Sequence, residues 1–434
     1  MSQTATTTEA LTYEQLSEAV TGAAALRART RLQPAGGPGT KVFPPTYAGA
    51  VYAVERRRLP GREEPVTCVL LDSVQSQANR MEAALQDAVD GVLGDELSVR
   101  IPLIAVDFSG YGPDGDADEK LRLIDSIERV TSLQAPHRVA DAILRDSVYR
   151  HNGQMQPFRK SEIGEAIDRA DLRNATPLYE LCPTALVFGM WDSTGPKGGL
   201  GVKFERAMAS EIVGVGCPYA FEGDEARPKH RGVRNDPLGI RAAVRVSKHS
   251  LTEWEVADDA KAKGTLSPAE INHSNVPFDG DNAGVTIEYA EQTTVLSLAA
   301  LRRLRFPPKG KPWQASKQQR ERDRAAQTVL AALALCAAEL AAADMDLRSR
   351  CLLWPEQTRQ WELLDNPGQE PARHALGAEA AVALLREAVE AAKKAGVTWQ
   401  EEPIRLEPSE PLVRLVRKSQ EQAAKEGAEE GGEA

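Results

Sequence analysis

The chain has 434 residues, of which 42% are hydrophobic and 27% are charged, so it can bury one large core or two ordinary ones. Its formal net charge of -10 argues against a polyanionic partner unless the basic residues are segregated. Five scattered cysteines without a CxxC pair and six histidines without an HExxH motif predict reduced thiols and neither a metal site nor a cofactor. With no signal-peptide pattern and no run of about 18 apolar residues, we expect a soluble cytoplasmic protein without a membrane partner.

Strand and helix patterns alternate irregularly along the chain. Strands are expected at 66–71 and within 98–109, 184–191, 239–247 and 283–301. Helices are expected after Ser73, over 204–215, and in the alanine-rich stretches at 327–354 and 375–397. The long polar segment 137–177 also has a helical pattern. Together these features predict an α+β fold with a sizeable insertion rather than a doubly wound sheet.

Composition divides the chain into regions. We expect an N-terminal segment (1–40), a core (41–315) with an insertion at about 110–180, a helical C-terminal extension (316–417) and an acidic disordered tail (418–434). Basic residues gather in two stretches of the core. Seven Lys or Arg stand against one acid over 227–249, and nine stand against two acids over 302–324. A polyanion would meet this local charge rather than the net charge of the chain.

The stretch FGMWDSTGPKGGLGVKFERAMASEIVGV (188–215) has four glycines between Gly195 and Gly201, flanked by Lys197 and Lys203. It lacks the GxxxxGK followed by Ser or Thr of a nucleoside triphosphatase and the GxGxxG of a dinucleotide fold. Glycines that allow close backbone approach, together with nearby Lys and Arg side chains, still favour phosphate binding without hydrolysis. A solvated turn with ordinary lysines is the alternative.

Three blocks together resemble a known family. They are LLDSVQSQANRMEAAL (70–85), the stretch PLYELCPTALVFGMWDSTGPKGGLGVKFERAMASEIVG (177–214), and the region around KHRGVRNDPLGI (229–240). Over about residues 40–310 the sequence is similar to the backbone subunit of type I-U CRISPR surveillance complexes, also called type I-G, in the repeat-associated mysterious protein (RAMP) superfamily. The resemblance implies a modified RNA-recognition-motif (ferredoxin-like) core with thumb and finger insertions.

The resemblance also implies a function. Copies of such a subunit line up along CRISPR RNA with other subunits and present the guide to target DNA, and a separate helicase-nuclease cuts. The chain lacks the aromatic RNP1 signature and has 5% aromatic residues, so we expect contact with the RNA backbone rather than general base stacking. One rival is a nucleotide-binding, transferase-like enzyme that uses the Gly195–Gly201 loop for a small phosphorylated ligand. Another is a protein-interaction adaptor.

The candidate RNA-binding residues fall into three groups, and no catalytic residue is predicted. They are Ser73, Gln75, Ser76, Asn79 and Arg80 at the start of a helix, Lys197, Lys203 and Arg206 around the glycines, and His230, Arg231, Arg234 and Arg241 in the first basic stretch. Ser73 and Ser76 could instead only cap the helix, and the pair Lys203 and Arg206, expected on one helix face, could be solvated. The second basic cluster, Arg302, Arg303, Arg305, Lys309 and Lys311, is either a binding site or an exposed linker. Neither Asp107 nor Asp192 aligns with the catalytic aspartate loop of nuclease relatives, so we expect no nuclease activity.

Overall fold

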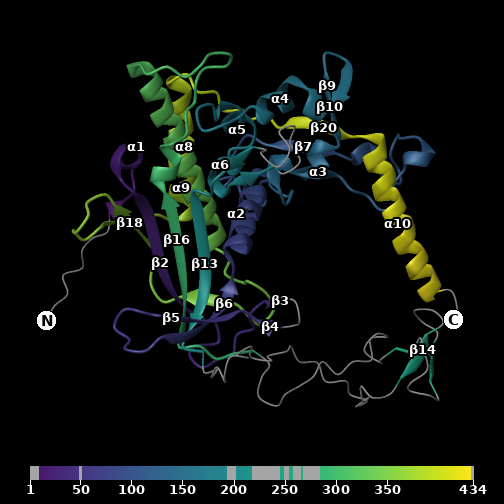
Figure 1. Cartoon of the computed structure of the whole chain (residues 1–434), viewed down its shortest axis with the longest axis horizontal. Coiled ribbons are helices and arrows are strands. Elements are labelled where there is room, and N and C mark those ends of the chain that lie inside the picture. Colours follow the sequence, from purple (N-terminus) through teal and green to yellow (C-terminus); the bar gives the residue numbers. More distant parts are fainter. Residues whose placement is uncertain are drawn as a thin grey trace.

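A large antiparallel-rich sheet is the centre of the computed structural model, which describes residues 9–47, 51–192, 202–217, 245–248, 254–257, 265–266 and 284–431. In these residues the sheet runs in the order β1-β19-β18-β2-β16-β13-β6-β5, and β17 pairs with the end of β2. Its strands are β1 (Glu9–Ala10), β2 (Ala25–Pro34), β5 (Val54–Arg57), β6 (Val66–Asp72), β13 (Met208–Val215), β16 (Tyr289–Ser297), β17 (Leu353–Pro355), β18 (Gln360–Leu364) and β19 (Ala372–Ala375). Figure 1 shows β2, β16 and β13 as the long strands at its centre.

The strand β2 illustrates how the sequence specifies this sheet. Leu26 and Ala28 are buried, whereas the alternating residues Arg29 and Arg31 are exposed on the opposite face. On that open face Arg29 pairs with Glu291 of β16 at 2.8 Å. The period of two therefore places apolar residues toward the helices and ion pairs toward solvent.

Helices cover the apolar face of the main sheet. They are α1 (Tyr13–Gly22), α2 (Val74–Val89), α7 (Leu298–Leu301), α8 (Lys317–Ala342) and α9 (Ala378–Lys394). The helix α8 packs against α1, α2 and α9, and Figure 1 shows α8 and α9 alongside the sheet. This helix is long and apolar enough to span a membrane. However, 89% of its most apolar stretch of 18 residues is buried inside the fold, and this burial accounts for its apolar sequence.

The chain connects four of the central strands in a regular way. In space the strands lie in the order β18-β2-β16-β13, and every neighbouring pair is antiparallel. In sequence, α2 lies between β2 and β13, β13 precedes β16, and α8 lies between β16 and β18. The strands β6 and β5 extend the sheet beyond β13.

A second, smaller sheet lies beside the first. Its strands are β7 (Ile104–Asp107), β8 (Arg129–Thr131), β9 (Ser147–His151), β10 (Gln154–Pro157) and β20 (Ile404–Pro408), in the order β10-β9-β20-β7-β8. Near it are α3 (Ala142–Arg145), α4 (Glu162–Asp168), α5 (Thr176–Leu181) and α10 (Glu410–Gly431), and α6 (Thr184–Phe188) packs against α8 and β13 of the main sheet. The remaining strands form hairpins: β3 (Thr46–Tyr47) with β4 (Val51–Tyr52), β11 (Met190–Trp191) with β12 (Lys203–Phe204), and β14 (Val246–Lys248) with β15 (Trp254–Val256).

Several predicted elements are confirmed. The strand expected at 66–71 is β6, the helix after Ser73 is α2, and the strand expected within 98–109 is β7. The residues 283–301 contain β16 and α7, and the alanine-rich stretches contain α8 and α9. All five cysteines are free and buried, and burial raises the pKa of the Cys336 thiol to about 12. The α+β class is therefore confirmed.

Two elements around the glycine stretch were predicted wrongly. The expected strand at 184–191 is mostly the helix α6, whose residues are buried on every side, so periodicity could not distinguish helix from strand. The expected helix over 204–215 is β12 followed by β13. Phe204, Met208 and Ile212 are spaced four residues apart, which places them on one face of a helix. The same spacing also places them on one face of a strand, so the pattern fits both structures.

The elements of the fold cross the boundaries of the predicted regions. The N-terminal segment 1–40 contains β2, the strand between β18 and β16, so the core begins before residue 41. The region 316–417 is no separate helical extension, because α8 fills the core and β17, β18 and β19 join the main sheet. The segment 137–177, expected to be helical, holds the β9–β10 hairpin between short helices. Residues 418–431, expected to be disordered, continue α10, where Arg417 pairs with Glu421 at 2.9 Å.

Candidate nucleic-acid interface

The strands on either side of the glycine stretch pair as a β-hairpin, so the glycines are not followed by a helix. In the hairpin β11–β12, Trp191 lies directly opposite Lys203, and Gly195 to Gly201 connect the two strands. The glycines and Lys197 lie outside the described residues. Lys203 is exposed, and the Trp191 side chain is 61% exposed. A cation and a large aromatic ring therefore stand together at the base of the loop.

A shallow groove of about 410 Å³ runs along the base of this hairpin, and we call it the hairpin groove. His137, Trp191, Lys203 and Arg206 line it. Arg206 and Lys203 do not share a helix face as predicted, since Arg206 lies beyond the end of β12, but the fold brings both to this groove. Burial and the nearby Arg138 lower the pKa of Arg206, whose Nε donates to the Phe188 carbonyl at 3.1 Å. Arg206 is thus partly structural, and Lys203 is the more available cation.

A buried ion pair supports the hairpin from beneath. The Arg138 guanidinium donates to both carboxylate oxygens of Glu82 in α2, at 2.6 and 2.7 Å, and to the Gly189 carbonyl at 3.0 Å. The two charged side chains are only 11% and 4% exposed. Burial raises the pKa of Glu82, and the Arg138 charge opposes that shift. Sequence reasoning missed both residues, because 56 positions separate them and neither belongs to a motif.

The start of α2 divides the first group of candidates. Ser73 caps the helix by accepting from the Ser76 amide at 3.2 Å. The buried Asp72 carboxylate accepts from the Ser76 hydroxyl at 2.8 Å and from Arg80 at 3.0 Å, and it also pairs with Arg348 at 3.1 Å. Ser73, Ser76 and Arg80 therefore have structural roles at the junction of β6 and α2.

Two other candidates on α2 are exposed. Gln75 and Asn79 lie four positions apart, so they share a helix face that is open to solvent. Asn79 precedes Glu82 by one helical turn, and Glu82 is tied through Arg138 to the hairpin. The Glu82–Arg138 pair thus connects α2 to the residue just before the hairpin. The third group, His230, Arg231, Arg234 and Arg241, lies outside the described residues.

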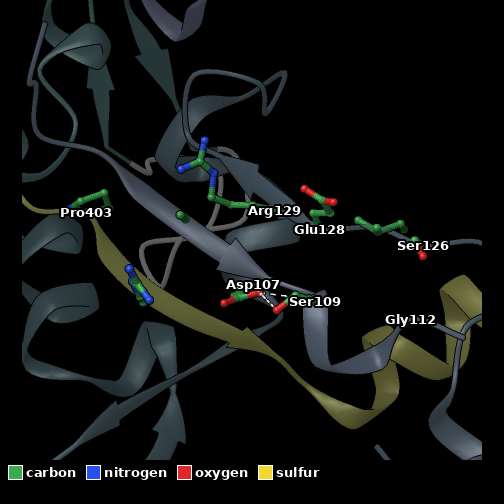
Figure 2. A pocket seen from close by; sticks show the side chains of 10 residues that line it. Asp107, Ser109, Gly112, Ser126, Glu128, Arg129 and Pro403 are labelled. Atoms are coloured by element: carbon green, nitrogen blue, oxygen red, sulfur yellow. Dashed lines mark hydrogen bonds between the residues drawn. The ribbon is translucent and has the colours of Figure 1, made fainter. Parts of the chain in front are cut away.

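The aspartates considered for catalysis have other roles. Asp192 is buried and pairs with Arg159 at 2.6 Å, and the same guanidinium pairs with Asp168 at 2.7 Å. Asp107 accepts from the Ser109 amide at 3.0 Å and from its hydroxyl at 2.7 Å, and these bonds lower its pKa. Figure 2 shows this pair at the end of β7, in a pocket of about 470 Å³ on the smaller sheet. In the described part of the chain, no group of three or more His, Cys, Asp or Glu side chains could bind a metal ion.

The geometry defines an α+β protein in which an exposed cation, Lys203, and an exposed indole, Trp191, face each other across a β-hairpin. Residues 26–218, from β2 to just beyond β13, match the family model described as CRISPR-associated protein GSU0053. Over these residues, which are less than half of the chain, the sequence is similar to this CRISPR-associated family, in agreement with the resemblance noted in the sequence.

No curated protein matches the chain. Among solved structures it is similar to the crystal structure of Thermofilum pendens Csc2, with 11% identity over 94% of this chain and 90% of that chain, and a TM-score of 0.26.

Proposed function

We propose that the chain is a non-catalytic backbone subunit of a CRISPR surveillance complex that binds CRISPR RNA mainly through its sugar-phosphate backbone. The match of residues 26–218 to a CRISPR-associated family carries this proposal. Several copies would assemble along one guide in the cytoplasm, beside other subunits. Target DNA would then pair with the guide, and a separate helicase-nuclease would cut it.

The strand connections support a modified RNA-recognition-motif core. The elements β2, α2, β13, β16, α8 and β18 follow one another as β-α-β-β-α-β, the pattern of ferredoxin-like folds. Both helices pack on the same side of the four antiparallel strands. In this proposal β6 and β5 are additions to the core, and the segment 110–180 is the insertion that approaches the RNA.

The hairpin groove supports phosphate binding. A phosphate beside Lys203 gains a charge-assisted contact, and a base can lie against the Trp191 ring. The exposed amides of Gln75 and Asn79 can contact 2′-hydroxyls, which distinguish RNA from DNA. Most bases would remain free to pair, as a guide requires.

The test is a binding measurement with purified protein and labelled CRISPR RNA. Lys203→Glu should weaken binding about tenfold, because one charge-assisted contact is worth about 1.4 kcal/mol or more. Arg100→Glu is the matched control, because it makes the same charge change at a side chain that is 72% exposed. Arg100 does not line the hairpin groove. Equal affinity of wild type and Lys203→Glu would refute the proposed site. Tight binding of a mononucleotide, without dependence on RNA length, would favour the transferase-like rival.

A further inference from the structure

A second basic depression lies beyond the hairpin groove. The hairpin groove shares Lys203, Phe204 and Glu205 with an adjoining depression of about 230 Å³, whose other wall includes Arg303 and Leu304. The neighbouring residues Arg302 and Arg305 line a third depression of about 490 Å³, which we call the Trp313 pocket. Residues of the short segment 302–305 line both of the last two depressions, so the three form a series.

Positive charge accompanies the series along its length. Arg303 donates to Glu205 at 2.8 Å and is exposed, so it links the hairpin to the segment 302–305. In the Trp313 pocket, Arg302 and Arg324 donate to backbone carbonyls of α1, at 3.2 and 2.8 Å. Carbonyls position a guanidinium without neutralising its charge. The exposed Arg320 also lines this pocket.

An aromatic ring is fixed within the same pocket. The Trp313 indole Nε1 donates to Asp323 at 2.8 Å, and the other oxygen of this carboxylate accepts from the Phe306 amide at 2.8 Å. The Arg305 guanidinium lies 5.5 Å from the centre of the indole ring. Asp323 is therefore engaged in orienting the ring, and the arginines dominate the charge that a ligand would meet.

We propose that the Trp313 pocket is a second contact for single-stranded nucleic acid, which would extend from the hairpin groove across Arg303. Guanidinium groups would bind phosphates, and one base would stack on Trp313. A cationic series that includes an oriented indole suits a polymer in which every unit carries both a negative charge and a flat base. At the hairpin groove this inference rests on the proposed function. At the Trp313 pocket it rests on the residues that line that pocket.

The experiment compares oligonucleotides of two lengths on the full-length protein. A strand of about 5 nucleotides fills one contact region, and a strand of about 15 can reach a second. Arg320→Glu and Trp313→Leu should each weaken binding of the long RNA about tenfold and leave binding of the short RNA unchanged. Trp313→Phe should restore most of the affinity, because it keeps a ring that stacks although it loses the bond to Asp323. Arg100→Glu is again the charge control.

The outcomes separate this inference from the proposed function. If Lys203→Glu weakens both lengths and Arg320→Glu weakens only the long one, both proposals stand. If Lys203→Glu has no effect while Arg320→Glu weakens the long strand, the proposed hairpin site fails and the second contact remains. Wild-type affinity of Arg320→Glu and Trp313→Leu for the long strand overturns the inference. Repeating the binding measurements with single-stranded DNA identifies the natural occupant, since the Trp313 pocket should bind more tightly the kind of strand that it contacts in the complex.

Discussion

The buried pair of Glu82 and Arg138 allows a sharp prediction about stability. The two side chains are 4% and 11% exposed and share two hydrogen bonds of 2.6 and 2.7 Å. Arg138→Met would leave the Glu82 carboxylate buried without its cation, which costs about 3–5 kcal/mol of unfolding free energy. Replacing both residues, as Glu82→Leu with Arg138→Met, should recover most of that loss, because apolar pairs often replace buried ion pairs without penalty.

Urea denaturation of wild type, Arg138→Met, Glu82→Leu and the double variant measures the effect. The same variants separate stability from positioning, since Arg138 also donates to the Gly189 carbonyl at the base of the hairpin. The double variant should therefore regain stability but keep a reduced affinity for RNA. Arg100→Met is the surface control, with an expected change within about 0.5 kcal/mol. If Arg138→Met costs no more than that control, the reasoning about the buried pair is wrong.

Four further predictions follow from single features. If each copy neutralises about 3 phosphates, RNA affinity should fall with salt at a log-log slope of roughly -2 per copy, and a flat titration would contradict the electrostatic contact. Gly189→Ala should cost about 1–3 kcal/mol in a denaturation experiment, because Gly189 has φ 84 and ψ 158, and an added Cβ would lie 3.2 Å from the Phe204 carbonyl oxygen. Burial lowers the pKa of His374 below its ordinary 6.5, so the unfolded chain takes up the proton first and stability should fall as pH drops below about 6.5, more in wild type than in His374→Gln. Asp192→Asn should lower the melting temperature, because it breaks the buried pair with Arg159, and neither wild type nor the variant should cleave RNA. If wild type cleaved RNA and Asp192→Asn did not, Asp192 would be catalytic.

The local patterns of the sequence predicted part of the fold. The strand β6 and the helix α2 were predictable because an apolar run ends at a capping serine and a helical stripe follows. The strand β2 was missed, since its buried positions include Ala28 and Thr30 and its exposed positions are arginines, which is a weak apolar alternation. The nature of the glycine stretch was also missed, because pairing of Trp191 with Lys203 is a tertiary property that no local pattern records.

The candidate site was predictable to a similar extent. Lys203 and Arg206 were found through charge beside glycines, and the structure places both on one groove. Ser76 and Arg80 looked equally suitable, but they bond to the buried Asp72, which also pairs with Arg348, 276 positions along the chain. Sequence reasoning identifies which groups can bind phosphate. It cannot identify which of them the fold has already used.

The most direct test of the central claim is to purify the protein after co-expression with a CRISPR array, size the assembly and sequence the nucleic acid that it retains. We expect uniform guide RNA in a large, regular assembly from the wild-type protein. Lys203→Glu should retain less RNA, and Arg100→Glu should match wild type. A nucleic-acid-free monomer, or retention of unrelated RNA by all three proteins alike, would contradict the account.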